Sequence, residues 1–389
     1  MTTAFVRSPW SGNASAEELA TWSDVAHQVA VKVAETAAER DRTSARPFDV
    51  LQLIRDSGLT NLLVPTDFGG HGAHWETAFL VTRILARVDA SAAQILGYHW
   101  LNQACVTFYG PEESRQARWY TDSATGKWMW SDSFNPVSPD LTIVAEGDNY
   151  RLSGFKKFAT GASVADIIIA GGVATGGAFD GELIVFALDN NREGVEHIDD
   201  WDHLGYRSSA SGSVRYTNVL ITPEDIIGAD KDEPFSSVVT PGVQLLFGNV
   251  YLGIAEGALE QAKELTLARK NSWFLSGVDT YAQDPITQRV YGDLVSKTVA
   301  VEALADKLNR YFDDVVALGG KTTAEDRANL EIKIAQLKVV STDVALDVAN
   351  RVYELTGASS TQSSVGLDRH WRDIRTHSLH DPVDYKRIE

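Results

Sequence analysis

A block of short β-rich runs between two helical stretches is the feature that most limits the fold of this chain. From about Trp128 the runs read "NYRLSGFKKFATG", "ADIIIAGGVA", "GELIVFALD" and "SGSVRYTNVLIT". Each run is rich in β-branched or aromatic residues and is bounded by Gly, Asn or Asp, as strands and their turns are. The sequence therefore predicts an α+β protein in which one strand block interrupts a helical chain.

The stretches on either side of the strand block have helical spacing. "ETAFLVTRILARV" puts four apolar residues on one helix face, namely Leu80, Ile84, Leu85 and Val88. After about Pro241, "YLGIAEGALEQAKELTLARK" and "NLEIKIAQLKVVSTDVALDVANRVYELTG" predict longer helices. We expect the second of these to stop at Gly357, because glycine commonly follows the last helical residue.

This order divides the chain into three parts. We expect an N-terminal helical domain at residues 1–127, a middle β domain at 128–238 and a C-terminal helical bundle at 239–389. The strand block is too short for an enzyme of its own. The three parts are therefore expected to share one site at their junction.

Charge and cysteine content indicate which classes of partner are unfavourable and which cellular compartment is expected. The net charge of −18 argues against nucleic acid or an anionic membrane, since both need a basic surface. No apolar run approaches the roughly 20 residues of a membrane helix, and the first residues lack a signal-peptide pattern. Cys105 is the only cysteine, which fits a reducing cytoplasm.

Five motifs in order resemble the acyl-CoA dehydrogenase superfamily. They are "SGLTNLLVPTDFGGHGA", "LSGFKKFATGA", "DDWDHLGYRSSASGSVRYTNVLITPEDIIG", "ARKNSWF" and "PITQRVYGDL". The resemblance covers almost the whole chain. It implies a helical N-terminal domain, a middle β-barrel domain and a C-terminal four-helix bundle.

Within that superfamily, "GYHW" and "DRHWRDIRTHSLHDPVDYK" resemble one branch. This branch holds the two-component flavin-dependent monooxygenases, including dibenzothiophene monooxygenase and its sulfone- and indole-oxygenating relatives. The resemblance implies a separate flavin reductase that supplies FMNH2 or FADH2. It also implies molecular oxygen as co-substrate, a flavin C4a-hydroperoxide, and a sulfur-containing or aromatic heterocyclic (indole-like) substrate.

The rival interpretations are an acyl-CoA dehydrogenase, a nitroalkane-oxidase-like flavoenzyme and a flavin-binding scaffold without catalysis. Aligning Arg372 and Asp373 with the family's "R-D" places Asp381 where a dehydrogenase has its catalytic Glu. The Asp carboxylate is one methylene shorter, and a base must lie about 3 Å from the proton that it takes. Dehydrogenation is therefore disfavoured but left open.

The branch resemblance implies four catalytic residues, namely His99, Thr160, His380 and Asp381. An imidazole with an ordinary pKa near 6.5 can hold a peroxide and supply a proton, and Asp381 could fix the tautomer of His380. His377, His380 and Asp381 could instead bind a metal, since catalytic metals use such ligands. We expect no metal, because no other ligand cluster stands in the sequence.

The resemblance also implies the flavin contacts. Phe158 would pack on the isoalloxazine ring, Thr160 would reach its N5 or O4 edge, and His377 and His380 would lie in a flap over it. The stretch "WSDSFNP" would contact the pyrimidine side through Trp130, Ser131, Asp132 and Ser133. A β-turn held by local hydrogen bonds is the alternative for this stretch.

Arg269 resembles the arginine that binds flavin phosphates across a subunit interface, as a guanidinium can do with two hydrogen bonds. That role implies a homo-oligomer, which we expect to be a homotetramer. The stretch "ELTGA" departs from the family pattern on the adenine side, so FMN and FAD both stay open. The predicted walls of the substrate pocket are Trp100, Gln103, Phe134 and Trp273.

Overall fold

The computed structural model describes residues 8–110, 113–134 and 140–380. The N-terminal part is helical, with α1 (Ala16–Thr43), α2 (Phe48–Asp56), α3 (Trp75–Ala86), α4 (Ala90–Phe108) and α5 (Glu113–Gly126). Side-chain caps set two of the helix starts. Ser15 accepts from the Glu18 N–H ahead of α1, and Asp89 accepts from the Ala92 N–H at 3.0 Å ahead of α4.

The middle part is a sheet domain. Its strands are β1 (Trp130–Asp132), β2 (Leu141–Glu146), β3 (Asn149–Lys156), β4 (Ile167–Thr175), β5 (Leu183–Asp189), β6 (Val195–Ile198), β7 (Ser213–Ile221) and β8 (Ile226–Asp230). The strand order is β6-β7-β3-β2-β4-β5-β8, with β1 paired in parallel to β4. In the described residues this path ends at β6 and β8, so the predicted barrel is open between those two strands.

The C-terminal part is a helical bundle made of α6 (Val239–Ala268), α7 (Pro285–Val316), α8 (Ala324–Thr356) and the shorter α9 (Asp368–His377). Helix α8 begins with a capping box between Thr323 and Asp326. It ends at Gly357, as predicted, where φ is 72°.

Helix α6 is the central element of the molecule. It packs on α3 and α4 on one side and on α7 and α8 on the other. A Cβ at Gly257 would lie 2.0 Å from the Arg87 carbonyl, so only glycine allows α6 to approach the end of α3 this closely. By length and composition the segment Ser236–Ala268 could cross a membrane, but 83% of its apolar window is buried inside the protein, as in a core helix.

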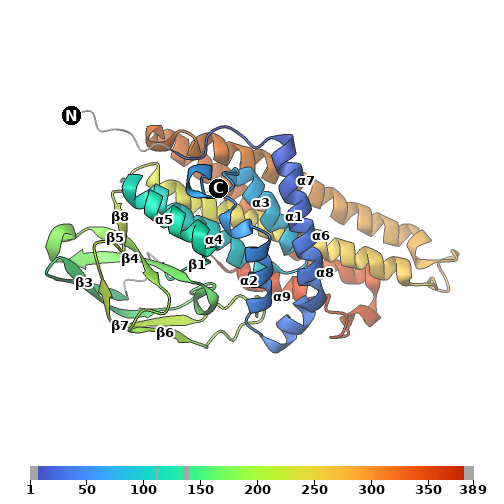
Figure 1. The fold of residues 1–389 in the computed structure, drawn as a ribbon. Helices are drawn as coiled ribbons and strands as arrows, with labels where there is room; N and C mark the ends of the chain where they lie inside the picture. The colour runs from blue at the N-terminus through green and yellow to red at the C-terminus, as the bar shows by residue number, and fades with distance from the viewer. Residues whose placement is uncertain (1–7, 111–112, 135–139, 381–389) are drawn as a thin grey trace.

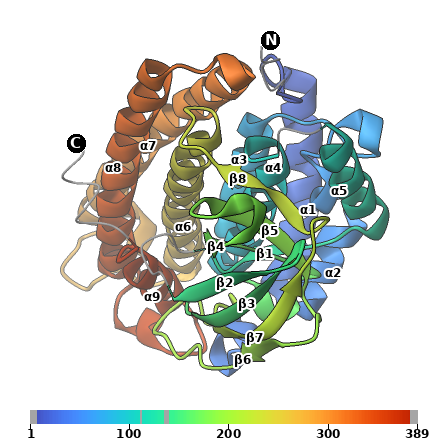
Figure 2. The same cartoon turned by 90° about the vertical axis from the view of Figure 1, so that its left-hand side faces the viewer.

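Two hydrophobic cores result. One core joins the N-terminal helices to the bundle, and the other fills the sheet domain. In Figure 1 the strands lie at the lower left, while α6, α7 and α8 extend to the right beyond the other elements. In Figure 2 the strands lie at the front, with α7 and α8 on the left and α1 and α5 on the right. The predicted α+β fold is confirmed, and α3 is buried almost all round rather than on one face.

Candidate active site

Helix α4 directs three polar side chains toward strand β1. His99, Asn102 and Gln103 are spaced three and four residues apart, so they share one face of the helix, and α4 packs on β1. All three side chains are buried. Buried polar groups normally have hydrogen-bond partners, so the partners of His99 and Asn102 define one wall of the site.

The imidazole of His99 fastens β1 to the N-terminal domain. Its Nε2–H donates to the Thr60 carbonyl at 2.8 Å, and its Nδ1 accepts from the Trp130 backbone N–H at 3.0 Å. Burial lowers the pKa of His99 to about 4, so the ring is neutral near pH 7. The prediction that His99 donates a proton to the oxygenating species does not hold here, because backbone groups occupy both ring nitrogens.

Asp132 is a buried carboxyl group where three parts of the chain meet. Its Oδ2 accepts from Asn102 Nδ2 at 3.2 Å, and the carboxyl also accepts from the Phe134 backbone N–H. Burial raises the pKa of Asp132 from 3.8 to about 6, while these hydrogen bonds and the charge of His380 oppose the rise. The electrostatic interaction with His380 brings the C-terminal segment to the same site.

The other β1 side chains are engaged inside the protein. Trp130 is buried and its Nε1 donates to Ser123 Oγ at 2.9 Å, so it belongs to the core and not to a flavin-binding surface. Ser131 Oγ donates to a carbonyl of β4 at 3.2 Å. Ser133 Oγ lies 2.6 Å from the Tyr216 hydroxyl. These bonds hold β1 against the sheet and support Asp132 from behind.

The loop after β3 carries an aromatic ring and a hydroxyl group. Phe158 has a φ of 62°, its side chain is 60% exposed, and its ring contacts Trp201 edge-on. A left-handed φ in a bulky residue costs about 1–3 kcal/mol and is typical of functional sites. Thr160 Oγ1 accepts from Ser211 Oγ at 3.1 Å, which leaves the Thr160 O–H to donate. The exposed ring of Phe158 could pack on a planar flavin, and the buried Thr160 follows it by two residues.

His377 and His380 have different surroundings. His377 ends α9 and is buried, with Nε2 lying 2.9 Å from Gln94 Nε2 and Nδ1 lying 2.7 Å from the Tyr251 hydroxyl. Burial lowers the pKa of His377 well below its ordinary value, so this ring is a neutral anchor. His380 is exposed and lies parallel to His377, with ring centroids 5.4 Å apart. His380 is therefore the histidine that a bound molecule can reach.

The predicted catalytic Asp381 lies outside the described residues. Within residues 8–110, 113–134 and 140–380, no three His, Cys, Asp or Glu side chains gather as metal ligands would. Both nitrogens of His377 are already hydrogen-bonded to protein groups.

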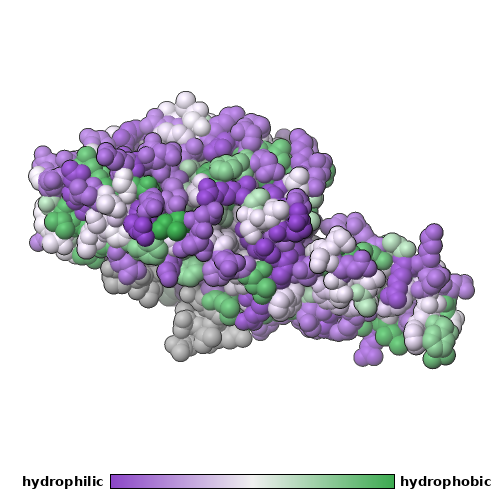
Figure 3. Space-filling view, turned by 90° about the horizontal axis from the view of Figure 1, so that it is seen from below, coloured by the Kyte–Doolittle hydropathy of each residue, from purple (hydrophilic) through white to green (hydrophobic). Residues whose placement is uncertain are grey.

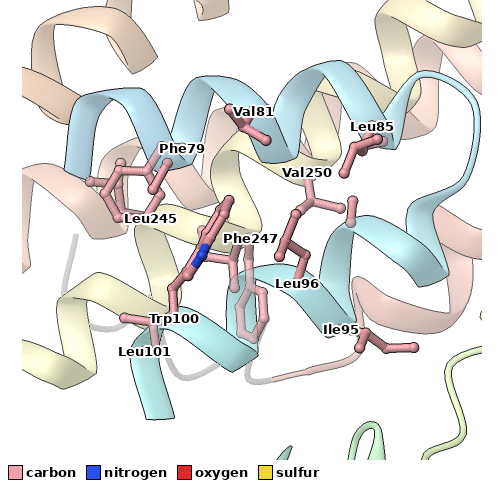
Figure 4. Close-up of a cluster of buried hydrophobic side chains, with 14 of the residues drawn as sticks. Phe79, Val81, Leu85, Ile95, Leu96, Trp100, Leu101, Leu245, Phe247 and Val250 are labelled. Atoms are coloured by element: carbon pink, nitrogen blue, oxygen red, sulfur yellow. The ribbon is translucent and has the colours of Figure 1, made fainter. Parts of the chain in front are cut away.

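Trp100 is part of the core, contrary to its predicted place in the substrate pocket. Its Nε1 donates to the Leu59 carbonyl at 2.8 Å and its ring is fully buried. Figure 4 shows its indole packed among hydrophobic side chains of α3, α4 and α6, including Leu245 and Phe247. It can support the pocket only from behind.

Gln103 and Phe134, two of the predicted walls of the substrate pocket, lie on the elements that carry the site, and their role as pocket walls stays a prediction. Gln103 is 1% exposed, and in the described part of the chain its Nε2 has no hydrogen-bond partner. An unpaired buried donor costs about 1–3 kcal/mol, so this amide suits an acceptor on a bound molecule. Phe134 packs on Gly171 of β4, where a Cβ would lie 2.1 Å from the phenyl ring.

Arg269 and Trp273 lie at the far end of α6. The Arg269 guanidinium stacks 4.1 Å from the centre of the Tyr281 ring, and Trp273 is 60% exposed in the following loop. At 1.5 Å per residue, Arg269 lies about 33 Å along α6 from Phe247, which contacts His380. Neither residue can therefore reach the Asp132 site of its own chain. In Figure 3 hydrophobic residues lie at the end of the molecule that extends to the right.

Asn102 and Lys338 belong to the site although no sequence motif marked them. Lys338 is buried on α8, and its Nζ donates to the His380 carbonyl at 2.7 Å. Two signals could have revealed them. Asn102 is spaced three residues from His99, and Lys338 interrupts the core-facing positions of "EIKIAQLKVV".

Models of the acyl-CoA dehydrogenase family match all three parts of the chain. The N-terminal domain matches residues 15–127, the middle domain residues 132–219 and the C-terminal domain residues 245–385. The fold is thus that of an acyl-CoA dehydrogenase. The exact domain limits 1–127, 128–238 and 239–389 stay a prediction.

Individual relatives define the branch. The chain is 36% identical to a probable FMNH2-dependent monooxygenase, SfnC, of Pseudomonas putida, over 93% of this chain and 91% of that protein. It is 36% identical to the dibenzothiophene monooxygenase of Rhodococcus qingshengii, over 93% of this chain and 90% of that one. The FMN-bound crystal structure of TdsC from Paenibacillus sp. A11-2 superposes with a TM-score of 0.90 at 32% identity, over 94% and 95% of the two chains. The chain therefore belongs to the acyl-CoA dehydrogenase superfamily, in its branch of two-component flavin-dependent monooxygenases, as the motifs predicted.

Proposed function

We propose that this protein uses reduced flavin and molecular oxygen to oxygenate a sulfur-containing or aromatic heterocyclic compound at the Asp132 site. The reduced flavin comes from a separate reductase. We take FMN as the flavin, because the relative SfnC is described as FMNH2-dependent and TdsC was crystallised with FMN. When bound, reduced flavin would supply the oxygen-activating chemistry, for which the family resemblance implies a C4a-hydroperoxide.

One observation carries this proposal. The buried Asp132 of β1 is hydrogen-bonded by Asn102 of α4 and interacts electrostatically with His380 of the C-terminal segment. Helix, strand and C-terminal segment therefore converge on one titratable group. A site that protects a reactive oxygen species needs such convergence, because it must combine proton donors with exclusion of water.

The chain's own residues have separate tasks in this proposal. Phe158 and Thr160 hold the flavin ring, the first by packing and the second by donating its O–H. His380 would donate a proton to the leaving oxygen atom. Asp132, close to His380, would hold or accept a proton. Gln103 donates its unpaired amide N–H to an oxygen or nitrogen of the substrate. His99 and His377 orient β1 and the C-terminal segment as neutral anchors.

The test combines a substrate panel with two histidine variants. Purified protein, reduced FMN and oxygen are incubated with dibenzothiophene, dimethyl sulfone or indole, and product and hydrogen peroxide are measured together. His380→Ala should consume reduced flavin as fast as the wild type but release mostly peroxide. His99→Ala should instead lose stability, because Thr60 and Trp130 each lose a buried backbone partner.

Two results would overturn the proposal. One is the absence of oxygenated product from every compound of the panel while oxidised flavin is reduced by an acyl-CoA. The other is a His380→Ala variant that converts as large a share of the reduced flavin into product as the wild type does. The first outcome would restore the dehydrogenase interpretation, and the second would remove His380 from the chemistry.

A further inference from the structure

A lysine is buried inside the C-terminal bundle directly behind the site. Lys338 on α8 is 2% exposed. Its Nζ donates to Gln244 Oε1 on α6 and to the His380 carbonyl at 2.7 Å. It also lies 5.3 Å from the centre of the Phe247 ring. The ammonium group thus joins two bundle helices to the C-terminal segment.

A charged lysine side chain is energetically unfavourable at a buried core position. Taking an ammonium group out of water is unfavourable, and good hydrogen bonds only offset that loss of hydration. The neighbouring core residues Ile334 and Leu337 are fully buried and apolar. A methionine at position 338 would pack there without a charge. The packing of the bundle alone does not call for a lysine.

The contacts of His380 show what the lysine orients. The segment after α9 is a short turn, in which the His380 N–H donates to the His377 carbonyl at 2.9 Å. The His380 ring lies edge-on against Phe247, with centroids 4.9 Å apart. The hydrogen bond from Lys338 fixes the carbonyl of the same residue. The ammonium group therefore holds the backbone of His380, and the phenyl ring of Phe247 contacts its side chain.

We propose that Lys338 is a positioning residue that fixes the turn 377–380 so that the His380 imidazole faces Asp132. The inference rests on the proposed function, because it explains how His380 is held at the reacting oxygen. In this proposal Lys338 acts through His380 and not by contact with flavin or substrate. Its removal should free the turn and let water reach the site, so reduced flavin would yield peroxide in place of product.

The experiment compares two lysines of one helix. Lys338→Met removes the buried charge and keeps the length of the side chain. Lys333→Met is the matched control, because Lys333 is exposed on α8 and its Nζ lies 4.2 Å from the centre of the Tyr311 ring. Hydrogen exchange of the amides in the turn 377–380 is followed by mass spectrometry, beside exchange in α8 itself.

In Lys338→Met we expect the turn amides to exchange at least tenfold faster while α8 keeps its protection. The share of reduced flavin that ends in product should fall at least threefold, and Lys333→Met should change neither quantity. Equal turn exchange in Lys338→Met and wild type would overturn the proposal. Equal loss of protection in the turn and in α8 would also overturn it, because Lys338 would then only stabilise the bundle.

Two further arms keep the outcomes distinct. If Lys338→Met does not fold, Lys338→Gln is measured in the same way, since it keeps a donor of similar shape without the charge. If the wild type gives no oxygenated product, the proposed function fails. The exchange measurement then still decides whether Lys338 fixes the turn, because it needs no substrate.

Discussion

Replacing Asp132 by Asn should stabilise the protein near neutral pH. Asp132 is buried, and its pKa rises from 3.8 in the unfolded chain to about 6 in the folded protein. This difference corresponds to about 3 kcal/mol, by which the ionised carboxylate disfavours folding. The amide is uncharged but can accept only through its one oxygen. The loss of one of the two accepted hydrogen bonds destabilises the variant by about 1 kcal/mol. The free energy of unfolding should therefore rise by about 2 kcal/mol at pH 7.5.

The pH dependence of this gain has a definite sign. The folded protein holds the Asp132 proton more tightly than the unfolded chain does. The stability that this group contributes is therefore greatest below about pH 4 and falls as the pH rises from 3.8 to about 6. The advantage of Asp132→Asn over the wild type should grow by about 1 kcal/mol between pH 5.5 and 7.5.

Urea unfolding, followed by tryptophan fluorescence and by circular dichroism, measures both quantities. The comparison of variant with wild type cancels Asp373 and Asp313, whose pKa values burial raises to about 7. Asp24→Asn, on the exposed face of α1, is the control and should change stability by less than about 0.5 kcal/mol. If Asp132→Asn is less stable than the wild type at pH 7.5, or its advantage is independent of pH, then Asp132 is not a carboxylate strained by burial.

Three other substitutions test the remaining parts of the site. Gln103→Leu should raise the free energy of unfolding in urea by about 1 kcal/mol, because it removes an unpaired buried amide, yet lower product formation at least fivefold; a destabilised variant would contradict this. Thr160→Val should cost only about 1 kcal/mol of stability but reduce product formation well beyond twofold, and activity within twofold would show that its hydroxyl does not contact the flavin. Arg269→Gln should weaken the binding of reduced flavin in titrations. Light scattering of the wild type should give a tetramer, and a fully active monomer would refute both expectations.

The sequence predicted the order of elements well because local patterns specify them. The four β-rich runs became β3, β4, β5 and β7, and the long C-terminal helix stopped at Gly357. Strand β1 was missed, since "WSD" has only three residues and forms a strand only by pairing with Ile167–Ile169 of β4. Such pairing depends on the tertiary fold, which no local window of sequence contains.

The site was predicted by residue type but not by hydrogen bonding. A histidine in a motif carries no mark of whether backbone groups will occupy its nitrogens, and His99 lost its expected role for that reason. Trp130 was predicted to contact the flavin and Trp100 to line the substrate pocket, yet each indole N–H donates to a buried partner and each ring lies in the core. Helical spacing alone could have pointed to Asn102 and Lys338, but their partners Asp132 and His380 come from distant segments of the chain, which local spacing does not reveal.

The length of α6 gives the bundle two separate tasks. Near its start, Gln244 and Phe247 contact the lysine and the histidine that border the site. Near its end, about 33 Å away, Arg269 and the exposed loop with Trp273, Phe274 and Leu275 face outward. A rigid helix cannot bring both ends to one ligand. If Arg269 binds flavin phosphates, as the family motif implies, it must do so for a neighbouring copy of the chain. Assembly would then be a condition for holding the cofactor, and burial of the exposed aromatic loop would supply part of the free energy for it.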